Sequence, residues 1–195
     1  AKARHRRPGG TTIAAVIASA AVLGVGIGVG AHFLLAQRSP SASAASSSAK
    51  LHGEATWAAG AQPAPQITTL RDQTGRPFSL SSLRGRTVAM TFYDSHCNQA
   101  CPLEGRVIAA AERSLPAAQR PVLVVVSVNP LDTPGSARAA ARKWGLARAG
   151  SWHWLMGSHA QLARTWKAYH IFVAPTKGDI THTEALYLVD RRGYE

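Results

Sequence analysis

The sequence predicts an α/β domain that follows a single membrane-spanning helix in a chain of 195 residues. Residues 11–37 hold no Lys, Arg, Asp or Glu, and this apolar run exceeds the roughly 20 residues needed to cross a bilayer. From Gln66 onward, short apolar runs alternate with helical stretches, which is typical of an α/β domain. The length leaves room for one anchor, one linker and one domain.

Residues 1–10 form a basic head in front of the apolar run. Because positive charge is retained in the cytoplasm, we expect a single-pass protein of a bacterial-type cell membrane, with the N-terminus cytoplasmic and the domain on the extracytoplasmic side. A cleaved signal peptide is the alternative, since Ala42 and Ala44 offer a small-residue cleavage site. The run is longer than the roughly 7–15 residues of a signal sequence, which favours an uncleaved anchor.

Residues 38–65 are mostly Ser, Ala, Gly and Pro, a composition typical of a flexible tether. The formal net charge of the chain is +12, but about half of the excess lies in the head and the start of the tether. The sequence has no basic helix or base-stacking motif of the kind that binds nucleic acid, so that class of partner is excluded.

The predicted domain covers residues 66–195. A hairpin-like turn at 72–75 comes first, and residues 87–93 and 122–128 then predict central strands, the second buried on both faces. Three helices are predicted. The first covers 102–113, the second begins at Pro134 and ends at Gly145, and the third begins after Ser158, which caps its N-terminus. A last strand is predicted at 185–189. A turn at 190–193 leads towards a further strand, so we expect the fold to continue beyond Glu195.

Cys97 and Cys101 are the candidate functional residues. They lie on either side of a predicted turn from a strand to a helix. The N-terminus of a helix favours the thiolate form, which prepares both residues for metal binding or disulfide exchange. A plain structural disulfide is one alternative, although it would close too short a loop to stabilise much. Zinc is another, but the ligands fall short of a closed four-ligand site. Two thiolates and one imidazole suit copper, as Cu(I) and, with further ligands, Cu(II).

Among the eight histidines, His182 is the candidate for the third ligand. It is expected in the loop before the strand at 185–189, and in a thioredoxin-like sheet that loop packs against the cysteine turn. His96 is closer in sequence and could tune the charge at Cys97. The other six histidines are not candidate ligands. Three lie in the head, the anchor and the tether, and three lie on or beside predicted helices: His5, His32, His52, His153, His159 and His170.

Three stretches of the chain resemble the SCO/SenC family. They are residues 92–102 (FYDSHCNQACP), residues 126–130 with 132–134, and residues 181–183 before 187–190. The resemblance covers residues 66–195 and implies a thioredoxin-like (redoxin) fold with a central mixed sheet flanked by helices, behind a membrane anchor. It further implies that copper is bound by Cys97, Cys101 and His182.

The resemblance implies a metallochaperone that delivers copper to the apo-copper A domain of cytochrome c oxidase subunit II. The alternative is a thiol-disulfide oxidoreductase, in which Cys97 and Cys101 keep the cysteines of the acceptor reduced. A thiol reductant protein would then reduce Cys97 and Cys101 again. The C-x-x-x-C spacing argues against a general redox enzyme, which would carry C-x-x-C. A third hypothesis is that the domain is a binding module whose cysteines merely form a structural disulfide.

Overall fold

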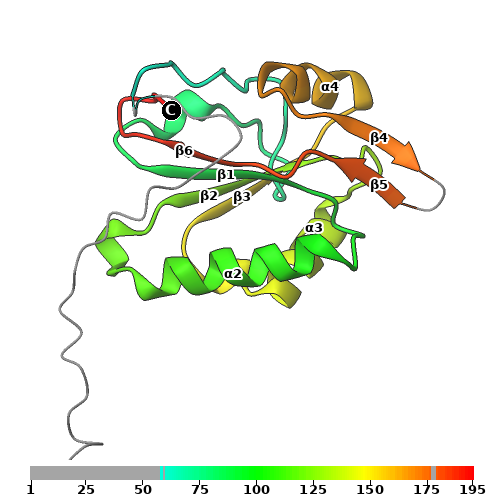
Figure 1. The fold of residues 1–195 in the computed structure, drawn as a ribbon, viewed down its shortest axis with the longest axis horizontal. Coiled ribbons are helices and arrows are strands. Elements are labelled where there is room, and N and C mark those ends of the chain that lie inside the picture. The colour runs from blue at the N-terminus through cyan, green and yellow to red at the C-terminus, as the bar shows by residue number, and fades with distance from the viewer. Residues whose placement is uncertain (1–57, 59, 177–178) are drawn as a thin grey trace, which may run out of the picture. The chain divides into compact units, whose positions relative to one another are not determined.

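The computed structural model describes residues 58, 60–176 and 179–195. A four-stranded sheet runs in the order β3-β2-β1-β6, and β4 and β5 form a separate two-stranded sheet. β1, β2 and β3 are parallel, while β6 is antiparallel to β1 (Figure 1). In chain order the elements are η1 (Leu80–Leu83), β1 (Val88–Tyr93), α2 (Ala100–Ser114), η2 (Ala117–Gln119), β2 (Val122–Ser127), α3 (Pro134–Trp144), η3 (Leu146–Arg148), β3 (Trp152–Leu155), α4 (His159–Ala168), β4 (Val173–Thr176), β5 (Asp179–His182) and β6 (Leu186–Val189).

Helices cover both faces of the central sheet. α2 and α3 lie on one face, and α4 lies on the other together with the segment that precedes β1 (Figure 1). This arrangement confirms the predicted mixed α/β sheet flanked by helices. It also brings the C-terminal ends of β1 and β2 to one edge, where the loops that follow them can meet.

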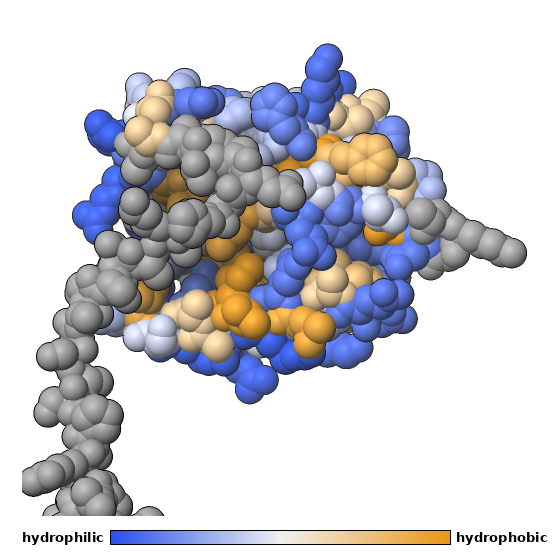
Figure 2. Space-filling view, in the orientation of Figure 1, coloured by the Kyte–Doolittle hydropathy of each residue, from blue (hydrophilic) through white to orange (hydrophobic). Residues whose placement is uncertain are grey.

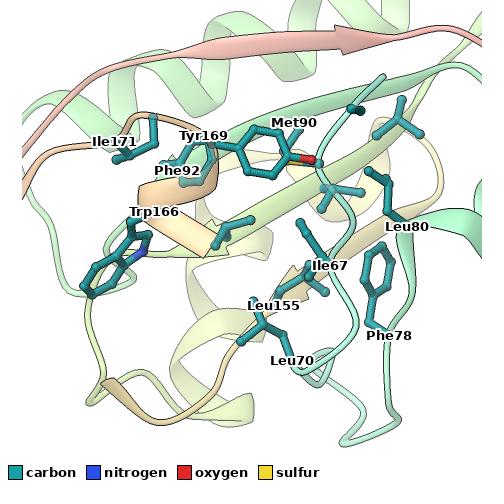
Figure 3. Close-up of a cluster of buried hydrophobic side chains, with 14 of the residues drawn as sticks. Ile67, Leu70, Phe78, Leu80, Met90, Phe92, Leu155, Trp166, Tyr169 and Ile171 are labelled. Atoms are coloured by element: carbon teal, nitrogen blue, oxygen red, sulfur yellow. The ribbon is translucent and has the colours of Figure 1, made fainter. Parts of the chain in front are cut away.

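Burial of β2 on both faces is confirmed, because each of its residues is buried. Val122, Val124 and Val126 pack into the core under α4, part of which is drawn in Figure 3. Leu123 and Val125 pack into the second core, under α2 and α3. A strand without polar alternation therefore serves as the centre of two hydrophobic layers.

The predicted boundaries of two helices are confirmed by their caps. Thr133 and Ser136 form a capping box at the start of α3, and Gly145 ends that helix with φ of 85°, a left-handed conformation that favours glycine. Ser158 and Gln161 form the equivalent box at the start of α4. Each box satisfies backbone N–H groups that would otherwise have no partner.

Three elements differ from the expectation. Around the predicted turn at 72–75 the chain forms only isolated bridges, from Arg71 to Pro77 and to Met156, rather than regular strands. Strand β3 was not predicted, and it places His153 on a strand instead of a helix. The β4–β5 hairpin was also not predicted, and it makes His182 the last residue of a strand rather than part of a loop.

Residues 60–65, which the sequence assigned to the tether, belong to the domain. Pro63 bridges to Tyr194, the Gly60 N–H donates to the Glu195 carbonyl, and Ala64 is buried in the core. The predicted anchor at 11–37 lies outside the described residues. Within the described part of the chain, no helix is both long and apolar enough to cross a membrane.

Glu112 is a buried carboxyl on the inner side of α2. It is only 3% exposed, and neither of its oxygens has a hydrogen-bond partner. Burial raises its pKa from 4.5 to about 7, although the charge of Arg120 opposes the shift. Because the pKa is higher in the folded state, the carboxyl stabilises the fold below about pH 4.5, and this contribution is lost as the pH rises through about 7.

Glu112→Gln is expected to remove a pH dependence of stability. Relative to the variant, the wild type should lose about 3 kcal/mol of unfolding free energy between about pH 5 and pH 8, as its buried carboxyl ionises. Urea unfolding at both pH values measures the difference, and Glu112→Leu serves as a second variant that also removes the polar atoms. If both variants keep the pH profile of the wild type, Glu112 is not the group responsible.

Candidate metal centre

The two cysteines lie on either side of the point where α2 begins. Cys97 is half-buried in the turn after β1, where its N–H donates to the carbonyl of Asp94 at 3.1 Å. Cys101 is 2% exposed and lies in the first turn of α2. Both are free thiols, and Cys97 is a hydrogen-bond partner of the Cys101 thiol. The sequence therefore located the pair at the strand-to-helix turn, but only Cys101 is on the helix itself.

His182 approaches Cys101 from the β4–β5 hairpin, 81 positions away in the chain. Its Nε2 lies 4.0 Å from the Cys101 Sγ, and its Nδ1 lies 3.0 Å from the carbonyl oxygen of Thr183. A carbonyl can only accept, so in the neutral imidazole Nδ1 carries the proton and the lone pair of Nε2 faces the sulfur. A backbone carbonyl thus orients the imidazole, as a carboxylate does in many metal sites.

The protonation of Cys101 differs from the expectation. A helix N-terminus favours thiolate, but burial raises the pKa of Cys101, and the neighbouring Cys97 raises it further. Desolvation disfavours a charged sulfur more than the first turn of α2 stabilises it. Cys101 is therefore a thiol in the metal-free protein, and a soft cation would have to displace its proton on binding.

A pair of carboxyls lies beside the cysteines and was not singled out from the sequence. Glu104 follows Cys101 by one helical turn, and Glu184 follows His182 closely in the chain. Burial raises the pKa of Glu104, and the adjacent Glu184 raises it further. Two acidic positions 80 residues apart in sequence give no local signal, because only the packing of the segment before β6 against α2 brings them together.

A second polar network holds the cysteine turn from the side of β2. Asp132, whose side chain is 0% exposed, accepts from the hydroxyls of Ser95 and Ser127 at 2.6 and 2.7 Å. Asp94 accepts from the backbone N–H of His96 at 2.9 Å and from the side-chain amide of Asn129 at 3.0 Å. The loop after β2 therefore clamps the turn that carries Cys97.

His96 belongs to that network rather than to the sulfur pair. Its Nδ1 lies 3.2 Å from Asp132 and 3.4 Å from Asp94. Among the described residues, these three form the group whose ligand atoms all lie within 4.8 Å of one another. The ligand atoms of the two cysteines and His182 do not all lie within that distance of one another. Because the carboxylates already accept several protein donors, the network is best explained as a clamp on the turn.

The remaining described histidines lie elsewhere. His153 on β3 contacts Asp72 at 3.3 Å, His159 begins α4 and packs its ring on Trp166, and His170 follows α4 with φ of 55°. His5, His32 and His52 lie outside the described residues. Among the described histidines, His182 is the one that comes to the cysteines, as the sequence predicted.

A cavity of about 680 Å³ opens next to Cys97. Polar groups of the cysteine turn line one side, including His96 and Asn98, while apolar groups such as Val173 and Ile180 of the hairpin line the other. On the other side of the site, Leu103, Val107 and Leu186 are more than half exposed beside Glu104. Figure 2 shows apolar side chains gathered on the otherwise hydrophilic surface.

Comparison with known proteins identifies relatives of this domain. The family model described as SCO1/SenC matches residues 62–194. No curated protein sequence matches the chain.

Solved structures share the fold. ScoI of Bradyrhizobium japonicum with copper bound has a TM-score of 0.56 at 26% identity, covering 68% of this chain and 85% of that one. A SCO1/SenC family lipoprotein of Bacillus anthracis has a TM-score of 0.57 at 25% identity, covering 68% and 81%. BsSco, a member of the Sco family of cytochrome c oxidase assembly proteins in which a disulfide switch was identified, has a TM-score of 0.58 at 24% identity, covering 68% and 80%.

Proposed function

Because this chain belongs to the SCO1/SenC family, we propose that it binds copper through Cys97, Cys101 and His182 and acts in the assembly of cytochrome c oxidase. The observation that carries the proposal is the approach of the His182 Nε2 to the Cys101 Sγ at 4.0 Å, with the Cys97 thiol in contact. The copper-bound ScoI structure shares the fold at 26% identity and supports the choice of metal.

The ligand set determines which copper ion fits. Two thiolates and an imidazole are soft ligands that satisfy Cu(I) in a three-coordinate site, whereas Cu(II) requires further nitrogen or oxygen ligands. Both thiols lose their protons when the metal binds, so binding strengthens as the pH rises. The carbonyl of Thr183 keeps the proton of His182 on Nδ1 and leaves Nε2 free for the metal.

Copper leaves the site by ligand exchange with the acceptor. Cys97 is half-buried and lines the 680 Å³ cavity, whereas Cys101 is buried, so an incoming ligand reaches the metal from the side of Cys97. The acceptor is the apo-copper A domain of cytochrome c oxidase subunit II. The protein is held at the membrane by residues 11–37, with residues 38–57 as the tether and the domain on the extracytoplasmic side.

A second function, thiol-disulfide exchange, is favoured by the contact between the two free thiols. In that reaction Cys97 and Cys101 lose two electrons and form a disulfide, while the disulfide of the acceptor breaks and takes up both protons as two thiols. A thiol reductant protein then restores the dithiol. Reduction and metal delivery use the same sulfurs, so a single molecule cannot do both at once.

Copper is expected to bind only to the reduced protein. Oxidation of Cys97 and Cys101 to a disulfide removes both thiolates, so a Cu(I) titration against a competing chelator should give one tightly bound equivalent for the reduced chain and none for the oxidised chain. Reduction of the oxidised sample should restore binding, which controls for damage. Equal affinity in the two states would contradict a thiolate site, and the reduction potential of the pair would then test the exchange function.

A further inference from the structure

A basic groove runs along α2 from the middle of the helix to the end that lies away from the cysteines. It is a hollow of about 460 Å³ between α2, the C-terminal end of α3 and the η3 turn. Trp144 and Gly145 form part of its wall, and its charged lining residues are all cations. These four residues, Arg106, Arg113, Lys143 and Arg148, define the basic groove, and all four are exposed.

The cations of the basic groove have no carboxylate partner among the residues that the structure describes. Within the described part of the chain, the ion pairs involve His96, His153 and Arg192, and none includes a groove residue. Helix C-termini attract cations, which accounts for Arg113 and Lys143 in the last turns of α2 and α3. That effect does not explain Arg106, two turns before the end of α2, nor the convergence of four positive charges on one hollow.

The groove lies at the end where the chain enters the domain. β1, β2 and β3 begin at this end, and Gly60 and Pro63 meet the C-terminal residues there. More cations lie near this entrance, namely Arg84, Arg86, Arg191 and Arg192. The acidic residues around the cysteines lie at the other end: Asp94, Glu104, Asp132, Asp179 and Glu184. The separation is partial, because Asp190 and Glu195 also line the entrance, where Asp190 pairs with Arg192, and Glu104 is two residues from Arg106.

We propose that the basic groove binds the phosphate groups of anionic phospholipids and thereby docks the domain on the membrane with the cysteine end directed away from it. The inference rests on the proposed anchor. A coil of the length of residues 38–57 spans about 25 Å, so the entrance of the domain stays close to the bilayer. Cations at an anionic surface each strengthen binding about fivefold.

The membrane suits this surface better than an acidic protein does. A tether of this length keeps the groove at a high local concentration near lipid phosphates, and a domain docked through the groove leaves Cys97 and its cavity accessible to an acceptor. Electrostatic attraction falls off within about 8 Å at physiological salt. The groove must therefore reach the headgroups directly, and docking should weaken as salt increases.

Photo-crosslinking of the full chain in nanodiscs tests the proposal. One set of nanodiscs contains phosphatidylcholine alone, and the other adds phosphatidylglycerol that carries a photoreactive headgroup. In the mixed discs we expect lipid adducts on the peptides that carry Arg113 and Arg148. Arg113→Gln with Arg148→Gln should lower the docking equilibrium about 30-fold. The matched control is Arg164→Gln with Lys167→Gln, on the exposed side of α4, and it should leave the adducts unchanged.

Three results would overturn the proposal. Adducts spread evenly over the domain, or lost equally in the α4 control, would mean that attraction is general rather than localised. Loss of adducts with inorganic phosphate, but not with chloride at the same ionic strength, would assign the groove to free phosphate. A groove variant that labels like the wild type would exclude the groove outright. The Cu(I) titration of the same variants reports separately on the proposed function, and it should be unchanged.

Discussion

Cys101→Ser is expected to abolish tight Cu(I) binding. Cys101 is the buried residue of the proposed copper site, in contact with Cys97 and 4.0 Å from His182. Loss of an outer hydrogen-bond partner of a metal ligand already costs roughly 10–100-fold in affinity, and removal of one of three direct ligands should cost more than that. Chelator competition with the reduced protein measures the loss.

His182→Ala and Cys97→Ser should weaken copper binding by a comparable factor, since each leaves a two-coordinate site. The matched control is His170→Asn, because His170 is exposed and its φ of 55° is tolerated by asparagine. The control should bind like the wild type. If His182→Ala also binds like the wild type, the imidazole is not a ligand and the site consists of the thiols alone.

Asp132→Ala is expected to destabilise the domain by about 2–3 kcal/mol, the second largest effect. The substitution leaves the buried hydroxyl of Ser127 without its acceptor, which costs about 1–3 kcal/mol, whereas the half-buried Ser95 hydroxyl keeps Ser136 as a partner. Urea unfolding of the copper-free protein measures the loss. Leu131→Ala is the control, because the neighbouring Leu131 is 78% exposed and should change the stability by less than about 0.5 kcal/mol.

Asp132→Asn separates the effect of the clamp on copper from its effect on stability. The amide keeps one oxygen as an acceptor, so most of the fold should be retained while the grip on the turn at Ser95 loosens. A fall of about tenfold in Cu(I) affinity, measured where the protein is fully folded, would show that the clamp positions Cys97. Unchanged affinity would leave Asp132 with a purely structural role.

Local patterns were sufficient to predict the elements whose signals lie within one segment. The unbroken apolar run of β2, the Thr133–Pro134 start of α3 and the Ser158 cap each specify a structure through neighbours in sequence. β3 has only four residues, which is too short a run to show the alternation that marks a strand. The polar β4–β5 hairpin carries little of the apolar alternation that marks a strand.

The candidate site was predictable only as far as its parts are local. The C-x-x-x-C spacing placed Cys97 and Cys101 at a strand-to-helix turn, and a thioredoxin-like sheet suggested His182. Asp132 could not be found in this way, because its role depends on the pairing of Tyr93 with Ser127, which brings two loops together at one edge of the sheet. The raised pKa of Cys101 has no local sequence signal either, since burial is a property of the whole fold.

The hairpin that carries His182 forms its own two-stranded sheet, and its backbone ladder runs between β4 and β5. Val173 and Ile180 attach it to the core through side-chain packing. Such a unit can open locally at a smaller cost than unfolding of the central sheet. If copper binds as proposed, it can therefore be released by local opening of the hairpin, which withdraws His182 alone while Cys97 and Cys101 stay in place on the rest of the domain.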